Sequence, residues 1–449
     1  MLRERGDAPA ILSVDRVTLR TFAEIERDAL QCPHFRGAEI PERGAVIAVQ
    51  IGNSPFLPGL LLALWRAGCV PVLLDRSLEG AAKENALTAC GAAGLVTGGD
   101  DGHEGGTWPI LQTRAGRRLD AGADFLKLTS GTSNAPRAIR FTAAQLLADG
   151  ESICDTMGIA AEDLNYGVIP WSHSYGFSNL ITPLLCRGVP LVATEDRLPR
   201  AVLNGLISSE ATVFPGLPVF FQKLCELPGA RPTHLRLCIS AGAPLAGATA
   251  ESFRAEFGRK IHGFYGSSEC GGITFDAAEE PTPQGCVGEA MQGVTLLHDE
   301  TTGRIEVRSE AVGLGYLPDP EPEVLGDGRF VPGDLLEHTP HGYVIAGRVS
   351  DFINIAGRKL NPLEVEHAIR ACPGVREVIV FGVPHPRRGE EPIACFAGEV
   401  TADALQFHCA KLLPTWQVPR DFWKVEALPV NERGKISRKG LADIYAATR

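Results

Sequence analysis

The chain has 449 residues, of which 44% are hydrophobic and 22% charged, and a chain of this length needs more than one core. The formal net charge of −11 and the lack of a Lys/Arg run argue against a nucleic-acid platform, because phosphate backbones select basic faces. The twelve cysteines form no CxxC pair, and the N-terminus MLRERGDAPA lacks an apolar signal core. We therefore expect two or more domains with free thiols, in the reducing cytoplasm, and a small molecule or a protein as partner.

Apolar strands alternate with helical patterns through the first half of the chain. A strand is predicted at 45–50, a buried helix passes through Phe56–Trp65, and further strands are predicted at 70–74 and 235–239. The helix is too short to cross a membrane, so no transmembrane segment is expected. This alternation is typical of an α/β fold with parallel sheets, in which ligands bind at the carboxyl ends of strands. Chemistry is therefore expected in the turns after Leu128, Pro170, Ile239 and Phe264.

The sequence pattern changes twice after this α/β region. From about Gln284 the strands are punctuated by glycine, as in GRIEVRSEAVGLGY, and predict a small β-rich subdomain. Beyond Gly347 a helix at 362–371, a strand at 377–381 and a helix at 402–412 predict a separate α+β domain. The expected domains are thus 1–347 and 348–449.

A hydroxyl-rich turn, LTSGTSNAPR at residues 128–137, follows one of the apolar runs. A glycine lets the backbone turn tightly, and successive hydroxyl and N–H groups can surround an anion. The stretch is not a Walker loop, because G-x-x-x-x-G-K-[ST] is absent. Taken alone, it is as compatible with a Ser/Thr-rich surface turn as with a polyphosphate site.

This turn resembles the phosphate loop of the adenylate-forming superfamily, which includes acyl-CoA synthetases, peptide-synthetase adenylation domains and beetle luciferases. Further segments resemble motifs of that family and follow one another in the same order. They are PWSHSYGF at 170–177, SAGAPL at 240–245, YGSSE at 265–269, PGD at 332–334, GRVSD at 347–351, NPLEVE at 361–366 and NERGKISR at 431–438. On this series the chain is identified as a member of the superfamily.

The resemblance implies an N-terminal domain of layered α/β sheets, with a small β-rich subdomain, and a small mobile α+β C-terminal domain. It implies that a carboxylic acid and ATP form an acyl adenylate with release of pyrophosphate, after which a thiol takes the acyl group. The implied cofactors are ATP, Mg²⁺ and CoA or a phosphopantetheine. Rotation of the C-terminal domain about Ser350 would remove Lys435 from the site and bring Gly357 to it.

The resemblance also assigns residues to the nucleotide. Tyr265 would offer a flat face to adenine, with a packed core aromatic as the alternative. Ser268 would keep a hydroxyl for the α-phosphate, and Gly242 belongs to the SAGAPL segment. The grip on the β- and γ-phosphates would come from hydroxyls, backbone and one positive charge, namely Thr129, Ser130, Gly131, Thr132, Ser133 and Arg137.

Charged groups have roles of their own in the family. Glu269 would hold Mg²⁺, unless it is a solvated carboxylate at a strand end. Asp334 would accept both ribose hydroxyls, with a buried structural aspartate as the alternative. Arg348 would reach the same ribose or the α-phosphate. Lys435 is expected to carry adenylation, because a mobile ammonium stabilises the charge that builds on the α-phosphate oxygens.

The acid and the thiol have their own implied positions. His173 would line the carboxylate pocket and gate the route of the thiol, and a core histidine bonded to backbone is the alternative. Trp171 is as compatible with packing as with lining that pocket. Gly357 would line the narrow pantetheine passage, which a side chain would obstruct.

Three segments depart from the family pattern. Asn134-Ala135-Pro136-Arg137-Ala138 stands where the family has Gly-x-Pro-Lys-Gly, so that a rigid guanidinium fork replaces a point ammonium. Ser350 replaces an Asp or Lys at the hinge, and Asn354 replaces a frequent lysine that serves the thioester step. The region before the phosphate loop is shorter than in many relatives.

The leading hypothesis is a free-standing acid–thiol ligase that activates a fatty or aryl acid, because YGFSNL at 175–180 has no amino-acid-anchoring aspartate. A second hypothesis is a ligase that loads only an acyl carrier protein or stops at the adenylate. A third is a catalytically weakened nucleotide-binding protein, against which Lys435, Glu269 and Asp334 all speak.

Overall fold

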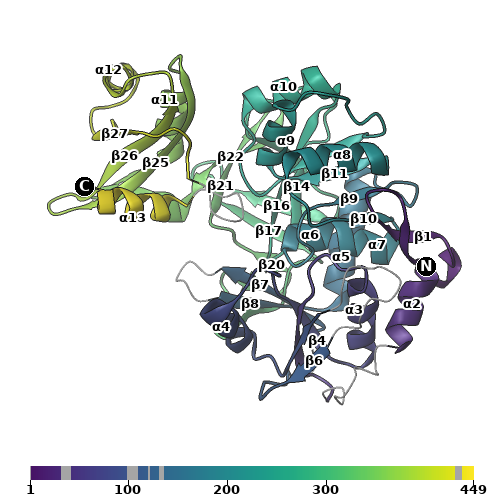
Figure 1. The fold of residues 1–449 in the computed structure, drawn as a ribbon. Coiled ribbons are helices and arrows are strands. Elements are labelled where there is room, and N and C mark those ends of the chain that lie inside the picture. Colours follow the sequence, from purple (N-terminus) through teal and green to yellow (C-terminus); the bar gives the residue numbers. More distant parts are fainter. Residues whose placement is uncertain are drawn as a thin grey trace. The chain divides into compact units, whose positions relative to one another are not determined.

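The computed structural model describes residues 2–31, 42–98, 110–119, 122–130, 136–429 and 437–448. These fold into two compact units (Figure 1). Unit 1 comprises Met1–Leu297, Glu306–Val331 and Thr339–Tyr343, and unit 2 comprises His298–Ile305, Pro332–His338 and Val344–Arg449. None of the helices in the described ranges combines the length and apolar character that a membrane span requires. The eleven cysteines in these ranges are free thiols, as the sequence predicts.

The first sheet of unit 1 places its four central strands parallel to one another, in the order β9, β11, β12 and β13. Because parallel strands share a direction, the turns that follow them lie at one edge. Antiparallel strands β2 and β14 extend the sheet on either side. Its strands that lie wholly in unit 1 are, in spatial order, β2 (Thr18–Thr21), β1 (Pro9–Leu12), β10 (Leu191–Ala193), β9 (Asn165–Gly167), β11 (Val213–Gly216), β12 (Leu237–Ser240), β13 (Ile261–Ser267), β14 (Gly271–Phe275) and β15 (Cys286–Ala290).

The second sheet of unit 1 is mixed. Strands β4, β3 and β5 are parallel, whereas β7 and β8 form an antiparallel pair in which Thr129 faces Arg137. The expectation of parallel sheets therefore holds for part of this sheet only, since the hydroxyl-rich turn connects two antiparallel strands. The spatial order is β18 (Gly315–Leu317), β8 (Pro136–Phe141), β7 (Phe125–Ser130), β4 (Val70–Leu73), β3 (Val46–Gln50), β5 (Gly94–Thr97) and β6 (Ile110–Thr113).

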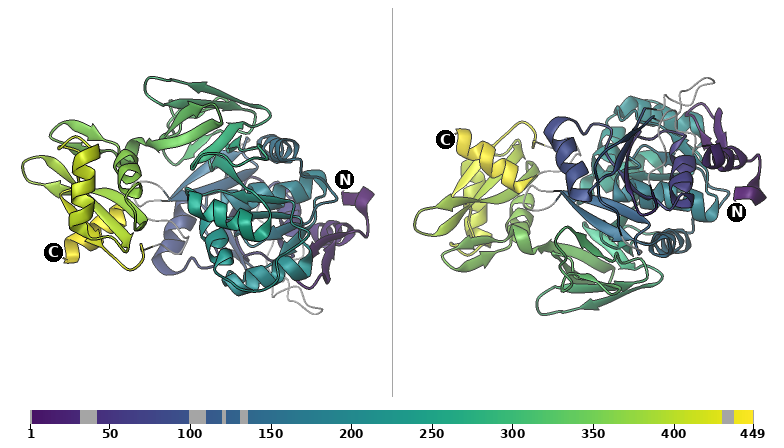
Figure 2. Two further views of the ribbon diagram at one scale, coloured as in Figure 1. Left: turned by 90° about the horizontal axis from the view of Figure 1, so that it is seen from above. Right: turned by 90° about the horizontal axis from the view of Figure 1, so that it is seen from below.

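Helices cover both sheets, as the two further views in Figure 2 show. Helix α5 has a capping box between Thr142 and Gln145, ends at the left-handed Gly158, and buries Ile153 and Met157 against the first sheet. The helices of unit 1 are α1 (Leu2–Arg5), α2 (Phe22–Gln31), α3 (Leu57–Arg66), α4 (Gly80–Cys90), α5 (Ala143–Met157), α6 (Ser174–Gly176), the π-helical turn η2 (Phe177–Ile181), α7 (Thr182–Arg187), α8 (Pro199–Ser209), α9 (Pro218–Cys225) and α10 (Gly247–Phe257).

A small antiparallel sheet follows these layers, which agrees with the glycine-punctuated pattern of the sequence. Its strands are β16 (Val294–His298), β17 (Ile305–Ser309), β20 (Arg329–Phe330) and β19 (Leu325–Gly326).

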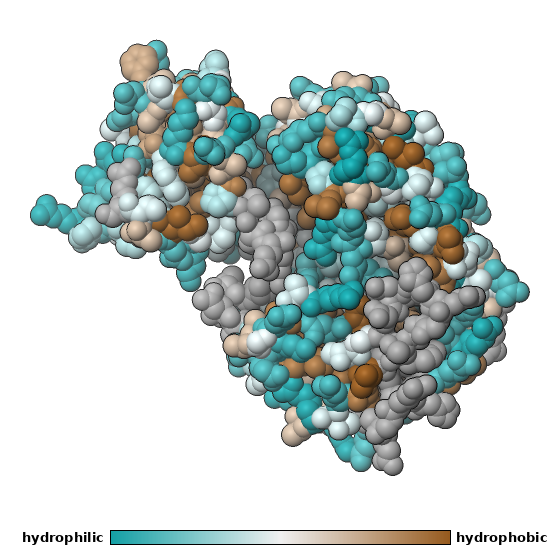
Figure 3. All heavy atoms as spheres, in the orientation of Figure 1, coloured by the Kyte–Doolittle hydropathy of each residue, from teal (hydrophilic) through white to brown (hydrophobic). Residues whose placement is uncertain are grey.

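On the face seen in Figure 3, apolar side chains are scattered among polar ones and form no broad patch.

Unit 2 has a sheet covered by helices on both faces. Side chains alternate along β25, so that Val378 and Val380 pack on one side with α11 and α12, while Phe381 packs on the other with Leu441 of α13. Figure 1 shows α12 and α13 on opposite sides of these strands. The strands of this sheet are, in spatial order, β24 (Arg358–Leu360), β23 (Ile353–Ile355), β26 (Gly389–Gly398) and β25 (Val375–His385), and β27 (Asp421–Lys424) pairs with β26. Its helices are α11 (Pro362–Arg370), α12 (Ala402–Leu412) and α13 (Arg438–Thr448). The sheet is preceded by β21 (Asp334–Thr339) and β22 (Gly342–Arg348), which lie mostly in unit 2, and by the 3₁₀ turn η3 (Val349–Asp351).

The predicted fold class is confirmed. The helix predicted at 402–412 has those bounds in the structure, and the buried helix predicted through Phe56–Trp65 is α3, which ends at Arg66. The strand predicted at 377–381 is longer, because β25 continues through a hairpin with β26. The domain boundary at 347/348 stays a prediction.

Candidate functional site

Two of the strand-end turns in unit 1 meet, as the sequence predicts. The Ser174 hydroxyl, which follows β9, donates to Ser268 Oγ after β13 at 2.8 Å. Tyr175 from the same turn donates to the carbonyl of Ile239 at the end of β12, at 3.1 Å. The carboxyl edge of the parallel strands therefore gathers hydroxyls from segments far apart in the chain. Gly242, two residues after the end of β12, is exposed and has a φ of +83°.

His173 lies at the start of this turn and is paired with a carboxylate. Its Nε2 lies 2.9 Å from Asp75 Oδ2, and both side chains are partly exposed. Ser77 donates its hydroxyl to Asp75 Oδ1 at 2.6 Å, while Gln50 Nε2 donates to the Asp75 carbonyl at 2.9 Å. The hydrogen bond with His173 holds the pKa of Asp75 well below its usual range. His173 is thus oriented by a carboxylate and not by backbone.

Asp75 was missed from the sequence, although a signal was available. It lies two residues after β4, at the carboxyl end of a strand, where the same rule that selected the other turns applies.

Trp171 is fully buried, so packing is the better of its two interpretations.

Glu269 follows β13 and is held by two hydroxyl donors. Tyr316 donates to Oε1 at 2.9 Å, and Ser267 donates to Oε2. An ionised carboxylate has about four lone-pair positions, so Glu269 keeps acceptor capacity and is partly exposed. Burial, and then the charge of Glu269, raise the pKa of Tyr316. Tyr316 therefore stays a donor at all physiological pH values.

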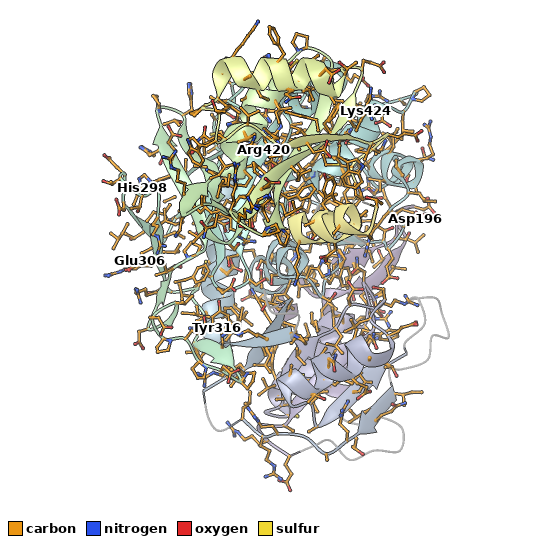
Figure 4. All side chains as sticks on the ribbon, turned by 90° about the vertical axis from the view of Figure 1, so that its left-hand side faces the viewer. Asp196, His298, Glu306, Tyr316, Arg420 and Lys424 are labelled. Carbon is orange, nitrogen blue, oxygen red and sulfur yellow. The ribbon has the colours of Figure 1, made fainter. Side chains whose placement is uncertain are left out.

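Tyr316, labelled in Figure 4, also joins Glu269 to the phosphate-loop strands. The Arg137 guanidinium stacks on its ring, with Cζ 3.8 Å from the centroid. Arg137 donates to the Asp319 carbonyl at 2.8 Å and pairs with Glu321 at 3.0 Å. A phosphate would compete with Glu321 for this guanidinium. No sequence signal pointed to Tyr316, which is 47 positions from Glu269.

The phosphate loop itself lies mostly outside the described residues. Thr129 and Ser130 end β7, and the Thr129 hydroxyl donates to the Arg137 carbonyl at 3.5 Å. Gly131, Thr132 and Ser133 belong to the part that the structure does not describe. The two described residues are therefore held by the pairing of β7 with β8.

Tyr265 lies on β13, opposite Thr274 of β14, and is 8% exposed. Tyr265 is therefore a buried residue. For Mg²⁺, no group of three or more His, Cys, Asp or Glu ligands occurs among the described residues. Magnesium sites commonly use one or two carboxylates together with substrate phosphates, so the single carboxylate of Glu269 fits such a site.

In unit 2, Asp334 and Arg348 form an ion pair between neighbouring strands β21 and β22. Arg348 Nε lies 3.0 Å from Asp334 Oδ1, and the two side chains are 56% and 20% exposed. Because Arg348 is more than half exposed, water weakens the pair, and both groups keep hydrogen-bonding capacity. The structure thus brings the two predicted ribose-binding groups together.

Gly357 occupies an exposed turn between β23 and β24. Its φ is +84°, that of Ala356 is +51°, and a Cβ on Gly357 would meet no atom within 4 Å. Asn354 Oδ1 accepts from the Gly357 N–H at 3.1 Å. Asn354 therefore stabilises the left-handed turn, which gives a physical role to one departure from the family pattern.

Lys435 lies outside the described residues, but the helix that follows it is firmly anchored. Arg438 donates to Asp351 Oδ2 at 3.0 Å, to Glu366 Oε1 at 2.7 Å and to the Val380 carbonyl at 3.0 Å. Arg370 donates to the other oxygen of Glu366 at 3.0 Å. Arg438 ties the predicted hinge segment, α11 and β25 to the segment after Lys435.

Two family models match the chain. The AMP-binding enzyme model matches residues 120–317, and the model of the AMP-binding enzyme C-terminal domain matches residues 364–435. Together they account for more than half of the chain. The first match includes the hydroxyl-rich loop, His173 and Glu269, and the second ends at Lys435.

Individual relatives agree with these matches. Naringenin synthase of Pestalotiopsis fici is 25% identical over 94% of this chain and 18% of its own length. Oxalate–CoA ligase of Saccharomyces cerevisiae is 25% identical over 71% of this chain and 62% of its own length. The chain spans less than two thirds of the length of either. The ATP-bound RpMatB-BxBclM chimera B3 has a TM-score of 0.85 at 25% identity, over 100% of this chain and 98% of the chimera.

Proposed function

The chain belongs to the family of AMP-binding enzymes, and from this premise we propose that it is an AMP-forming acid–thiol ligase. It would join a carboxylic acid, fatty or aryl, to AMP with release of pyrophosphate, and then transfer the acyl group to CoA or a phosphopantetheine thiol. The relatives support this proposal, because one of them carries the name of a CoA ligase. The carrier-protein route is the alternative.

The observation that carries the proposal is the hydrogen bond between Ser174 and Ser268. It joins the turn of His173 to the turn of Glu269, so that a hydroxyl, an imidazole and a carboxylate occupy one edge of the sheet. This edge is where α/β sheets bind ligands. A carboxylic acid beside His173 and phosphate oxygens beside Glu269 would lie at neighbouring turns, as adenylation requires.

Several residues of unit 1 have roles in this proposal. Glu269 would hold Mg²⁺, which neutralises phosphate charge when it is bound. Tyr316 keeps the Glu269 carboxylate oriented, and Asp75 keeps the imidazole of His173 oriented. Thr129 and Ser130 would contribute to the phosphate grip with Gly131, Thr132 and Ser133, while Tyr265, Ser268 and Gly242 would line the nucleotide.

The C-terminal part would supply the mobile groups. Asp334 would accept the ribose hydroxyls and Arg348 would donate beside them, while Lys435 would stabilise charge on the α-phosphate. Rotation about Ser350 would then replace Lys435 by Gly357 for the thiol step. This division, with domains 1–347 and 348–449, is part of the proposal.

The test is an ATP–pyrophosphate exchange screen over short, medium, long, aryl and dicarboxylic acids. At least one acid should support exchange, and CoA should then release AMP and acyl-CoA. A holo-carrier protein that replaces CoA as the better acceptor would favour the alternative. Exchange that is absent with every acid would contradict the proposed function.

A further inference from the structure

A buried ion pair lies on the strand that leads into the phosphate loop. Lys127 on β7 is 5% exposed and Asp149 on α5 is 3% exposed. Lys127 Nζ lies 3.9 Å from Asp149 Oδ2, and Ser178 of η2 bridges them. The Ser178 hydroxyl accepts from Lys127 at 3.4 Å and donates to Asp149 at 2.5 Å. Buried ion pairs rarely stabilise a fold more than apolar residues of the same volume, so stability alone explains this pair poorly.

Asp149 reaches a third segment through its other oxygen. Its Oδ1 accepts from the Gly272 N–H at 3.0 Å, three residues after Glu269. The approach depends on Gly271, whose φ is +71° and whose added Cβ would lie 2.0 Å from Asp149 Oδ1. Any side chain at this position would push the carboxylate away. The turn that carries Glu269 is thus shaped around Asp149.

Lys127 is surrounded by aromatic rings and carboxylates. Its Nζ lies 4.7 Å from the ring centroid of Phe141 and 5.8 Å from that of Phe177. Burial lowers the pKa of Lys127, while the charges of Asp149 and Glu269 act in the opposite direction. Phe177 and Ser178 belong to the π-helical turn that follows the His173 segment, and such turns occur often at functional sites.

We propose that Lys127, Ser178 and Asp149 form a buried clamp that positions the phosphate loop, the His173 turn and the Glu269 turn relative to one another. The proposal rests on the proposed function, because its effect is expressed through ATP binding. Lys127 and Asp149 are positioning residues that act through the segments they join. Without the clamp these segments keep their fold but lose their mutual register, and the polyphosphate grip weakens first.

The test compares Lys127→Met, Asp149→Asn and the double variant in ATP–pyrophosphate exchange with the best acid. Each single variant should raise KM for ATP about tenfold, with kcat and KM for the acid changed about threefold or less. Because the two residues act as a unit, the double variant should be no worse than either single variant. Ser178→Ala removes only the bridging hydroxyl and should show the same pattern with a smaller effect.

The matched control is Lys260→Met. Lys260, whose side chain is 9% exposed, pairs at 2.8 Å with the buried Asp276, but this pair lies at the other end of the β13–β14 hairpin from Glu269. It should lower the melting temperature without changing KM for ATP. If Lys127→Met fails to fold, the KM for ATP of Ser178→Ala and of Asp149→Asn is compared with that of Lys260→Met instead.

Two results would overturn the clamp. One is a KM for ATP within twofold of wild type in folded Asp149→Asn and Ser178→Ala, with only a lower melting temperature. The other is an additive double variant, which would show that Lys127 and Asp149 act separately. Failure of the proposed function has a different signature, since wild type and Lys260→Met would then also lack exchange.

Discussion

Two carboxylates, one in each unit, are held in opposite ways. Glu366 in unit 2 is fully buried, and its oxygens accept from Arg438, Arg370 and the backbone N–H of Val380. Glu269 in unit 1 is partly exposed and accepts from two neutral hydroxyls. The first carboxylate is fully used by the fold, whereas the second is oriented and still able to bind a ligand. Both belong to segments that resemble family motifs, YGSSE and NPLEVE, and the sequence alone does not reveal that their surroundings differ.

The largest effect is expected for Glu366→Gln, because it leaves Arg438 and Arg370 without their shared counter-charge. Breaking a buried pair costs about 3–5 kcal/mol, so the free energy of unfolding of unit 2 should fall by that order. Urea denaturation measures the change. Glu364→Gln, on the exposed side of the same helix, is the control and should stay within about 0.5 kcal/mol of wild type. Equal losses of unfolding free energy in the two variants would show that the buried contacts of Glu366 do not stabilise unit 2 more than an exposed glutamate does.

Glu269→Gln should lower activity strongly and stability only slightly, the reverse of what is expected for Glu366→Gln. The amide keeps the shape of the side chain and most of its hydrogen bonds but loses the charge that would hold Mg²⁺. We expect kcat for pyrophosphate exchange to fall about a hundredfold or more, with a small change in melting temperature. A titration with Mg²⁺ in exchange assays should show weaker activation in the variant. A stability loss like that of Glu366→Gln, with kcat preserved, would make Glu269 structural as well.

Asp75→Asn should have an intermediate effect. It keeps the contact with His173 but removes the charge that orients the imidazole, so kcat/KM for the acid should fall about tenfold. The depressed pKa of Asp75 means that its contribution to stability is complete above the ordinary aspartate pKa and is lost as the pH falls through the lower folded-state value. The difference in unfolding free energy between wild type and variant should therefore shrink below about pH 4. A difference that grows on acidification would contradict this sign.

The sequence predicted those parts of the site that depend on local order along the chain. Strand-end turns carry His173, Ser268 and Glu269, and the apolar runs located these turns to within a few residues, since β9 ends at Gly167 and β13 runs on to Ser267. Asp75 and Tyr316 are 98 and 47 positions from the groups that they orient, and only the folded sheets bring them together. Such partners are set by tertiary register, which no local pattern encodes.

The antiparallel pairing of β7 with β8 was missed for a related reason. An apolar run before a glycine-containing turn fits a strand–turn–helix unit and a strand pair equally well. Lys127 could have indicated a buried carboxylate, since a lysine within an otherwise apolar strand needs a buried partner. The structure supplies that partner in Asp149, 22 positions away in the sequence and on a different element.

In the proposed mechanism, unit 1 would orient the reacting groups and Lys435 would supply the mobile charge for adenylation. The direct measurement is the rate of adenylate formation by Lys435→Ala with the best acid from the screen, with Lys439→Ala on α13 as the control. We predict a fall of about a hundred- to a thousandfold for Lys435→Ala, with affinity for ATP nearly unchanged, and a rate close to wild type for the control. Adenylate formation by Lys435→Ala at the wild-type rate would contradict the account.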